Sequence, residues 1–169
     1  MPTANLTLDI DGNGYAQSAT AESRINAPVA RVWEVCTDVN KFPERVPMIS
    51  KVKVDGNRAT MQIKFKLSLF SVGFEFVVDM IKSEAEHTME LRYVSGEPKG
   101  IRLAFVLEPI DDGKATLMKA TGEFDAMSLG WLAKYFLKHH PEIQCGILPG
   151  VAVGLLESMR RAAEGRPKL

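Results

Sequence analysis

Strand-period alternation over the middle of the chain is the feature that most restricts its possible folds. From Ile49 to Asp125, apolar and polar side chains alternate in a series of segments. Turn sequences rich in Gly, Pro, Asn and Asp separate these segments. In residues 61–67, for example, every second side chain is apolar and the others are polar. Because the connections are short, we predict an antiparallel meander of about six strands with one apolar and one solvated face.

The segment before the meander predicts at least one more strand and two short helices. An alternating strand is expected over 16–26, and residues 1–15 form either an N-terminal extension or an extra hairpin strand. Pro28 begins a short helix at a position where its missing N–H costs nothing. A second turn of helix is expected over 40–45.

Helical periodicity returns after the meander. We expect one helix over 129–139 and a long C-terminal helix over 141–164, kinked at Pro149. A straight helix over 141–164 would measure about 35 Å, and no other segment is long enough to cover the sheet. The predicted fold is therefore α+β, a curved antiparallel sheet of about seven strands wrapped around this helix. Such a sheet does not pack closely against the helix along its whole length, and we therefore predict an apolar cavity between the sheet and the helix.

Composition excludes several classes of protein. The 169 residues include 21 basic and 21 acidic ones and are 46% hydrophobic, values typical of one globular domain over 1–169 rather than of a disordered chain. The balanced charge argues against a general nucleic-acid binder, so DNA is not an expected partner. The first residues lack the basic and apolar pattern of a signal peptide, and we expect a cytoplasmic protein.

The opening of the pattern is similar to that of a known superfamily. Residues 22–28 read Glu-Ser-Arg-Ile-Asn-Ala-Pro, Val32-Trp33 follow, and Asp38 precedes the pair Phe42-Pro43. This arrangement resembles the START-like or SRPBCC superfamily, and within it the polyketide cyclase and coenzyme Q-binding branch. The resemblance implies a helix-grip fold, with a pocket for a lipid, a polyketide or another hydrophobic small molecule.

Inward-facing apolar side chains are the candidate ligand contacts, although each is also compatible with plain core packing. The strands would contribute Met61, Ile63, Phe65, Phe74, Phe76, Val78, Met89, Leu91, Tyr93, Leu103, Phe105 and Met118, and the long helix Leu148, Val151 and Leu155. Gly146, Gly150 and Gly154 recur every four residues on this helix. They either allow a close helix approach or leave room for a ligand.

The sequence contains none of the catalytic motifs that we sought. It has no Gly-x-Ser-x-Gly elbow, no His-Glu-x-x-His and no phosphate-binding glycine loop, so we predict no catalytic residue, metal ligand or cofactor. Adjacent His139 and His140 would point about 100° apart on a helix, which makes them a poor metal site. Strand carboxylates such as Glu75 and Asp79 are expected to face solvent; a shifted register would place one in the pocket as a general base.

An aromatic and basic segment lies between the meander and the long helix. Trp131, Tyr135 and Phe136 stand beside Lys134 and Lys138. The segment is either a lid packed over the pocket mouth or a transient contact with a membrane surface. We hypothesise that the chain binds or transports a hydrophobic molecule or lipid, with a cyclase or dehydrase-type enzyme as the main alternative. Because some relatives act on ribosomes, the resemblance also leaves open a protein-interaction module.

Overall fold

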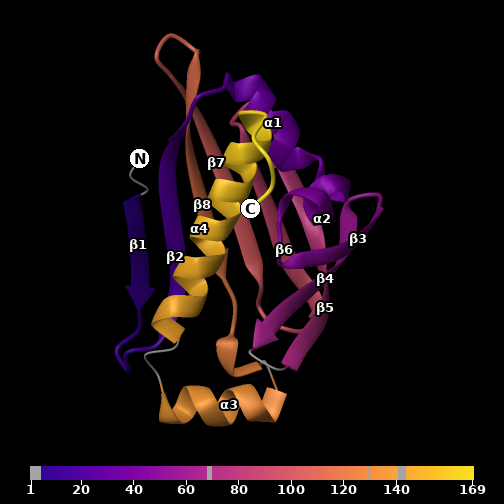
Figure 1. The fold of residues 1–169 in the computed structure, drawn as a ribbon, viewed down its shortest axis with the longest axis vertical. Coiled ribbons are helices and arrows are strands. Elements are labelled where there is room, and N and C mark those ends of the chain that lie inside the picture. The colour runs from indigo at the N-terminus through magenta and orange to yellow at the C-terminus, as the bar shows by residue number, and fades with distance from the viewer. Residues whose placement is uncertain (1–4, 68–69, 129, 141–143) are drawn as a thin grey trace.

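A computed structural model describes residues 5–67, 70–128, 130–140 and 144–169 of the chain. Eight antiparallel strands form a single sheet (Figure 1): β1 (Asn5–Ile10), β2 (Ala16–Ile25), β3 (Ile49–Asp55), β4 (Arg58–Leu67), β5 (Phe70–Ser83), β6 (Thr88–Gly96), β7 (Arg102–Ile110) and β8 (Ala115–Glu123). Their order in the sheet is β1-β2-β8-β7-β6-β5-β4-β3. Strands β3 to β8 are thus the predicted meander. The sheet has eight strands rather than about seven, because residues 5–10 form the extra hairpin strand.

The helices fall where the change of period predicts them. They are α1 (Val29–Thr37), the 3-10 turn η1 (Val39–Lys41), α2 (Phe42–Arg45), the 3-10 turn η2 (Ala126–Ser128), α3 (Gly130–His139) and α4 (Gln144–Ala163). Pro149 lies inside α4, and the helix continues on both sides of it. The part of α4 predicted over 141–143 lies outside the described residues. The α+β class and the long C-terminal helix are confirmed.

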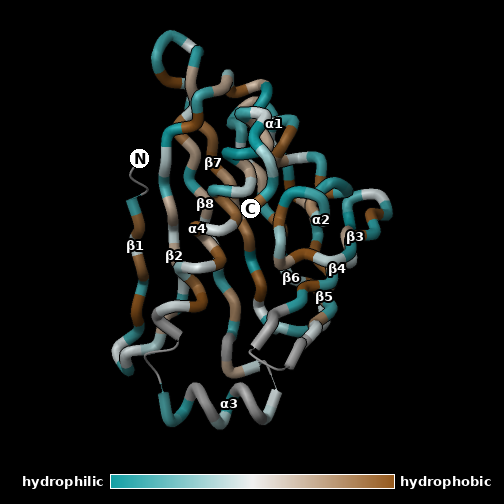
Figure 2. Tube along the Cα trace, viewed as in Figure 1, coloured by the Kyte–Doolittle hydropathy of each residue, from teal (hydrophilic) through white to brown (hydrophobic). Residues whose placement is uncertain are grey.

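The register between β4 and β5 shows why one face of the sheet is apolar. Met61 pairs with Phe76 and Ile63 pairs with Phe74, so apolar side chains stand opposite each other on the inner face. On the outer face, Gln62 Nε2 donates a hydrogen bond to Glu75 Oε2 at 2.8 Å. Figure 2 shows this alternation along the strands, with hydrophilic residues gathered in the turn between β7 and β8.

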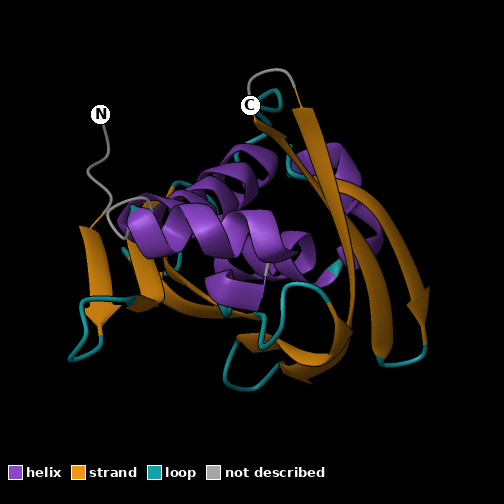
Figure 3. Cartoon of the chain, turned by 90° about the horizontal axis from the view of Figure 1, so that it is seen from below, coloured by secondary structure: helices purple, strands orange, loops and turns teal. Residues whose placement is uncertain are grey.

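The sheet curves around the helices, as the view along the molecule shows (Figure 3). Helix α4 packs against β2, β8 and α1, so it covers one half of the sheet more closely than the other. Its inner face contributes Leu148, Ala152, Leu155 and Met159 to the buried core. None of the helices in the described part of the chain combines the length and apolar character needed to cross a membrane.

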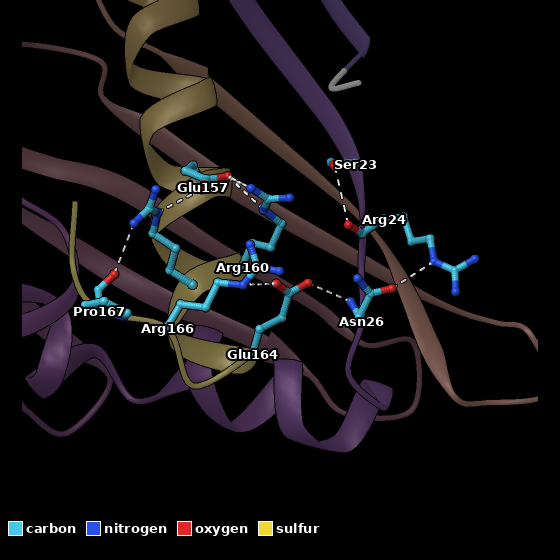
Figure 4. A network of polar contacts seen from close by, with 9 residues as sticks. Ser23, Arg24, Asn26, Glu157, Arg160, Glu164, Arg166 and Pro167 are labelled. Carbon is cyan, nitrogen blue, oxygen red and sulfur yellow. Dashed lines mark hydrogen bonds and ion pairs between the residues drawn. The ribbon is translucent and has the colours of Figure 1, made fainter. Parts of the chain in front are cut away.

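Polar contacts fasten the C-terminal end of α4 to the segment between β2 and α1 (Figure 4). The backbone N–H of Asn26 donates to Glu164 Oε1 at 2.9 Å. The other carboxylate oxygen of Glu164 lies 3.0 Å from Arg166 Nε. Gly165 follows with a φ of +69°, which ends the helix in the left-handed conformation that glycine adopts readily.

Candidate functional site

An apolar cavity lies between the inner face of the sheet and α4. The side chains around it are all apolar: Met48, Ile49, Ile63, Phe76, Pro98, Ile101, Leu103, Phe124, Val151 and Leu155. The space open to the centre of a water-sized sphere is ≈ 20 Å³. This is room for about one water molecule, so the cavity is the seam between two packed layers rather than an open pocket.

Neighbouring strands and successive helical turns bring the cavity walls together. Ile63 and Phe76 project from the adjacent strands β4 and β5, and Leu103 projects from β7. Val151 and Leu155 lie four residues apart on α4 and therefore share one face of the helix. The cavity lies toward the β4–β7 half of the sheet, where the curvature carries the strands away from α4.

The described lining offers no acid or base for chemistry. Carboxylates of the strands carry Arg partners on the outer face instead. A hydrogen bond from Arg58 lowers the pKa of Asp79, and one from Arg92 lowers the pKa of Glu90. Both groups are therefore charged at neutral pH and lie away from the cavity, as the alternation predicts.

Metal and thiol chemistry also find little support in the described part of the chain. Within it, no three His, Cys, Asp or Glu side chains lie close enough together to hold a metal ion. Cys36 is fully buried in α1, and burial raises the pKa of its thiol to about 12. The thiol is protonated at neutral pH, which suits packing rather than reactivity.

Comparison with known families identifies the chain. Residues 16–142, which are 127 of its 169 residues, match the family described as polyketide cyclase / dehydrase and lipid transport. The chain belongs to this family. The START-like resemblance of its opening motif is therefore confirmed. Strand β1 precedes the matched region, and the whole of α4 follows it. No curated protein sequence matches the chain significantly.

Solved structures share the fold of this polyketide cyclase and lipid transport family member at low sequence identity. A protein from Thermus thermophilus has a TM-score of 0.68 and 14% identity, covering 88% of this chain and 97% of its own. A START superfamily protein from Mycobacterium smegmatis has a TM-score of 0.63 and 13% identity, and the match covers 88% of this chain and 95% of that protein. The ZhuI aromatase/cyclase of a Streptomyces species has a TM-score of 0.61 and 16% identity, and the match covers 88% of this chain and 93% of the cyclase.

The predicted ligand contacts of this family member fall into three groups. Five line the cavity: Ile63, Phe76, Leu103, Val151 and Leu155. Seven are buried in the core and do not line the cavity: Met61, Val78, Met89, Leu91, Phe105, Met118 and Leu148. Phe74 and Tyr93 are partly buried against that core, and the Tyr93 hydroxyl donates to the Gly96 carbonyl at 3.1 Å. The side chain of Phe65 lies outside the described part of the structure.

Five cavity residues were not among the predicted ligand contacts. Ile101 continues the alternation of Leu103 and Phe105, so strand periodicity places it on the inner face. Met48, Ile49, Pro98 and Phe124 lie at strand ends or in connections, where alternation gives little signal. A weaker signal was available, because each is an apolar residue within or beside a turn sequence. Apolar residues at such positions are candidates for covering the end of a sheet rather than for its face.

Two of the three glycines in the α4 row lie away from both of the predicted uses. A side chain at Gly146 or Gly150 would meet no atom within 4 Å, and both residues are exposed and do not line the cavity. A Cβ at Gly154 would lie 3.6 Å from Met48 Cε, an ordinary contact distance. No close helix approach therefore requires glycine at these positions, and the structure gives no physical account of Gly146 and Gly150.

The aromatic and basic segment forms α3, which crosses the end of the sheet–helix layer (Figures 1 and 3). The side chain of Trp131 is 80% exposed and that of Tyr135 is 58% exposed. The side chain of Phe136 lies outside the described residues. Neither of the two described aromatic side chains is buried over the cavity, so a lid would have to use other residues of α3.

Proposed function

We propose that this chain binds and carries a hydrophobic small molecule or lipid, held between the sheet and α4, and performs no chemistry on it. One observation carries the proposal: every side chain of the described cavity wall is apolar, and none is ionisable. A cyclase needs an acid or base beside its substrate, and this wall supplies neither. The family description, which includes lipid transport, supports the same function.

The cavity must widen to accept a ligand. Sites for small molecules usually enclose roughly 300 Å³ or more, far above the ≈ 20 Å³ present here. The bound state is therefore an expanded one, and the cost of opening lowers the apparent affinity.

Met48 is the residue of the cavity wall whose side chain can move aside most easily. It is partly buried where the chain enters β3, and its Cε lies near Gly154 of α4. An unbranched methionine changes rotamer more easily than the branched residues around it. Since Gly154 has no side chain, Met48 can also move along α4 without meeting a Cβ. We infer that a ligand enters by displacing Met48 from this seam between β3 and α4.

Ser158 does not line the cavity, but its hydroxyl is the buried polar group that a ligand reaching beyond Leu155 along α4 would meet. It lies three residues after Leu155 on α4, is 2% exposed, and its hydroxyl has no hydrogen-bond partner among the described residues. A buried hydroxyl without a partner costs stability unless a ligand or water satisfies it. We infer that a ligand carbonyl accepts a hydrogen bond from the Ser158 hydroxyl, or that a ligand hydroxyl donates to it or accepts from it.

The expected affinity is modest. Burying about 300 Å² of apolar ligand surface contributes about 7 kcal/mol, against an association cost of about 4 kcal/mol or more. The remaining free energy of about 3 kcal/mol corresponds to dissociation constants in the millimolar range, and a ligand that buries more apolar surface would bind more tightly.

Titration with a dansyl-labelled medium-chain fatty acid tests the proposal. We expect saturable binding with enhanced dansyl emission, and native mass spectrometry should show one bound molecule per chain. Ile101→Phe adds volume inside the cavity and should weaken binding about tenfold, a change of about 1.4 kcal/mol. Its matched control is Ile81→Phe, because Ile81 is 43% exposed on β5 and the same substitution there leaves the cavity unchanged.

Two outcomes would contradict the proposal. Absence of binding by the wild-type protein to fatty acids of several lengths would refute the carrier function. Equal weakening by Ile101→Phe and Ile81→Phe would place the ligand elsewhere. Should Ile101→Phe fail to fold, Val151→Ile adds a single methyl group to the same wall and keeps the test available.

A further inference from the structure

Helix α3 presents one continuous aromatic and basic face. Trp131, Lys134, Tyr135 and Lys138 recur at intervals of three and four residues, which places them on the same side of the helix. All four side chains are exposed. Trp131 alone is 80% exposed, the largest value among the exposed large apolar side chains of the described chain. Core packing gives no reason for two large aromatic rings to stand side by side in water.

The charge of this face has a single sign. Residues 130–140 contain Lys134, Lys138, His139 and His140 and no acidic residue, whereas the whole chain is neutral with 21 charges of each sign. The Tyr135 ring lies 4.6 Å from the His139 ring, which keeps the aromatic and basic groups together. Two copies of this face would repel each other, so its charge complements an anionic surface and disfavours a second copy of the chain.

Helix α3 is also joined to the cavity wall by a short connection. Phe124 lines the cavity, and α3 begins six residues later. Two hydrogen bonds clamp the connection to the loop that carries Pro98 and Ile101. The backbone N–H of Lys99 donates to Ser128 Oγ at 2.7 Å, and that of Asp125 donates to the Lys99 carbonyl at 2.9 Å. These hydrogen bonds link the connection that leads to α3 with the segments that carry the cavity residues Pro98, Ile101 and Phe124.

We propose that the exposed face of α3 docks onto an anionic phospholipid bilayer, where the protein exchanges its hydrophobic ligand. The exchange step rests on the proposed function, whereas the docking contact does not. Trp and Tyr are the residues that favour the boundary between lipid headgroups and acyl chains. Lysines beside an anionic membrane contribute about 1 kcal/mol each. Two lysines and two aromatic rings give weak, reversible attachment, which suits a carrier.

Co-sedimentation of the full chain with phospholipid vesicles tests the docking. We expect binding to mixed phosphatidylcholine–phosphatidylglycerol vesicles, weaker binding at high salt, and little binding to phosphatidylcholine alone. The double variant Lys134→Ser, Lys138→Ser should lower the partition coefficient ~30-fold. Its control is Lys51→Ser, Lys53→Ser, which removes the same charge from two exposed positions on the β3 edge and should leave partitioning nearly unchanged.

Tryptophan emission adds a measurement that reports on the aromatic face itself. The chain has two tryptophans, Trp33 and Trp131. In a Trp33→Phe background, emission comes from Trp131 and should shift to the blue when anionic vesicles are added. In the wild-type protein, Trp131→Ala should reduce sedimentation with vesicles while leaving the far-UV circular dichroism spectrum unchanged.

The results separate the two proposals. Absence of vesicle binding, or equal losses in the two lysine double variants, would overturn the docking while leaving fatty-acid binding intact. Vesicle binding without fatty-acid binding would refute the ligand carrier and the exchange step and leave only the contact. Self-association that Trp131→Ala abolishes, in place of vesicle binding, would identify a second copy as the occupant and overturn the proposal.

Discussion

Gly96 is the residue whose local geometry most constrains the cavity wall. It ends β6 with a φ of +98°, and a Cβ there would overlap the Glu75 carbonyl oxygen and lie 2.6 Å from Phe76 Cα. Phe76 lines the cavity, and the register between β5 and β6 shifts just beside it, at Val77 and Val78. Glycine thus allows β6 to pass close over β5 where the sheet bends.

We predict that Gly96→Ala lowers the free energy of unfolding by at least ~3 kcal/mol, because the new methyl group meets rigid backbone as well as an unfavourable φ. Gly100→Ala is the control. Gly100 also has a positive φ, +67°, but a Cβ there meets no atom within 4 Å, so only ~1 kcal/mol should be lost. Urea unfolding measures both values. Equal losses would show that backbone conformation alone matters at Gly96.

At the scale of the element, α4 is held by charged groups at its C-terminal end. Glu157 Oε2 accepts a hydrogen bond from Arg160 Nε at 2.8 Å, and Glu157 Oε1 accepts one from Arg161 Nε at 2.8 Å. The hydrogen bond from Arg160 lowers the pKa of Glu157 below its ordinary value of 4.5; partial burial opposes this shift and the Arg161 bond adds to it. The two arginines also lie in the last turn of α4, where cations interact favourably with the helix dipole.

This arrangement predicts the direction of a pH effect. Since the folded pKa of Glu157 lies below the unfolded one, its contribution to stability is complete above pH 4.5 and is lost as the pH falls through the folded value. Glu157→Gln should therefore destabilise the protein at pH 7, and its difference from wild type should shrink in acid. Unfolding midpoints measured across the pH range check this. Glu86→Gln, in the exposed turn between β5 and β6, is the control for losing a negative charge, and an equal effect there would contradict the assignment.

At the scale of the whole molecule, the two halves of the sheet differ in how closely α4 covers them. The half formed by β2 and β8 packs directly against α4, whereas the seam toward β4, β5 and β7 contains the small cavity. The same interior therefore stabilises the fold and contains the proposed ligand-binding site. Removing volume at the seam should have opposite effects on these two properties.

We predict that Leu155→Ala lowers the free energy of unfolding by about 2–4 kcal/mol and strengthens binding of the dansyl fatty acid. The lost side chain enlarges the cavity and so reduces the cost of opening it. Val32→Ala, a fully buried position on α1 away from the cavity, should also destabilise the protein but leave the affinity unchanged. Calorimetry measures the stability of each variant, and fluorescence titration measures its dissociation constant for the dansyl fatty acid. Stronger binding in both variants would mean that the probe reports general loosening.

Much of the fold followed from local pattern. Alternation in residues 61–67 predicted which side chains of β4 face inward, and Pro28 predicted the start of α1, because both signals depend on neighbouring residues only. The inward positions of Ile63 and Phe76 could be predicted in the same way. Met48, Pro98 and Phe124 could not be assigned to the wall, since they reach it from separate connections that the curvature of the sheet brings together.

What this sequence determined by itself is the class of the fold, the order of its elements, the family, and the apolar character of the inner face, because each depends on residue type and spacing along the chain. Only the tertiary structure decided that the interior closes to ≈ 20 Å³ and that Trp131 stands in solvent. Both depend on how far the sheet curls and where α3 and α4 come to rest on it. Those distances are set by side-chain volumes summed over strands far apart in the sequence, and no local pattern records that sum.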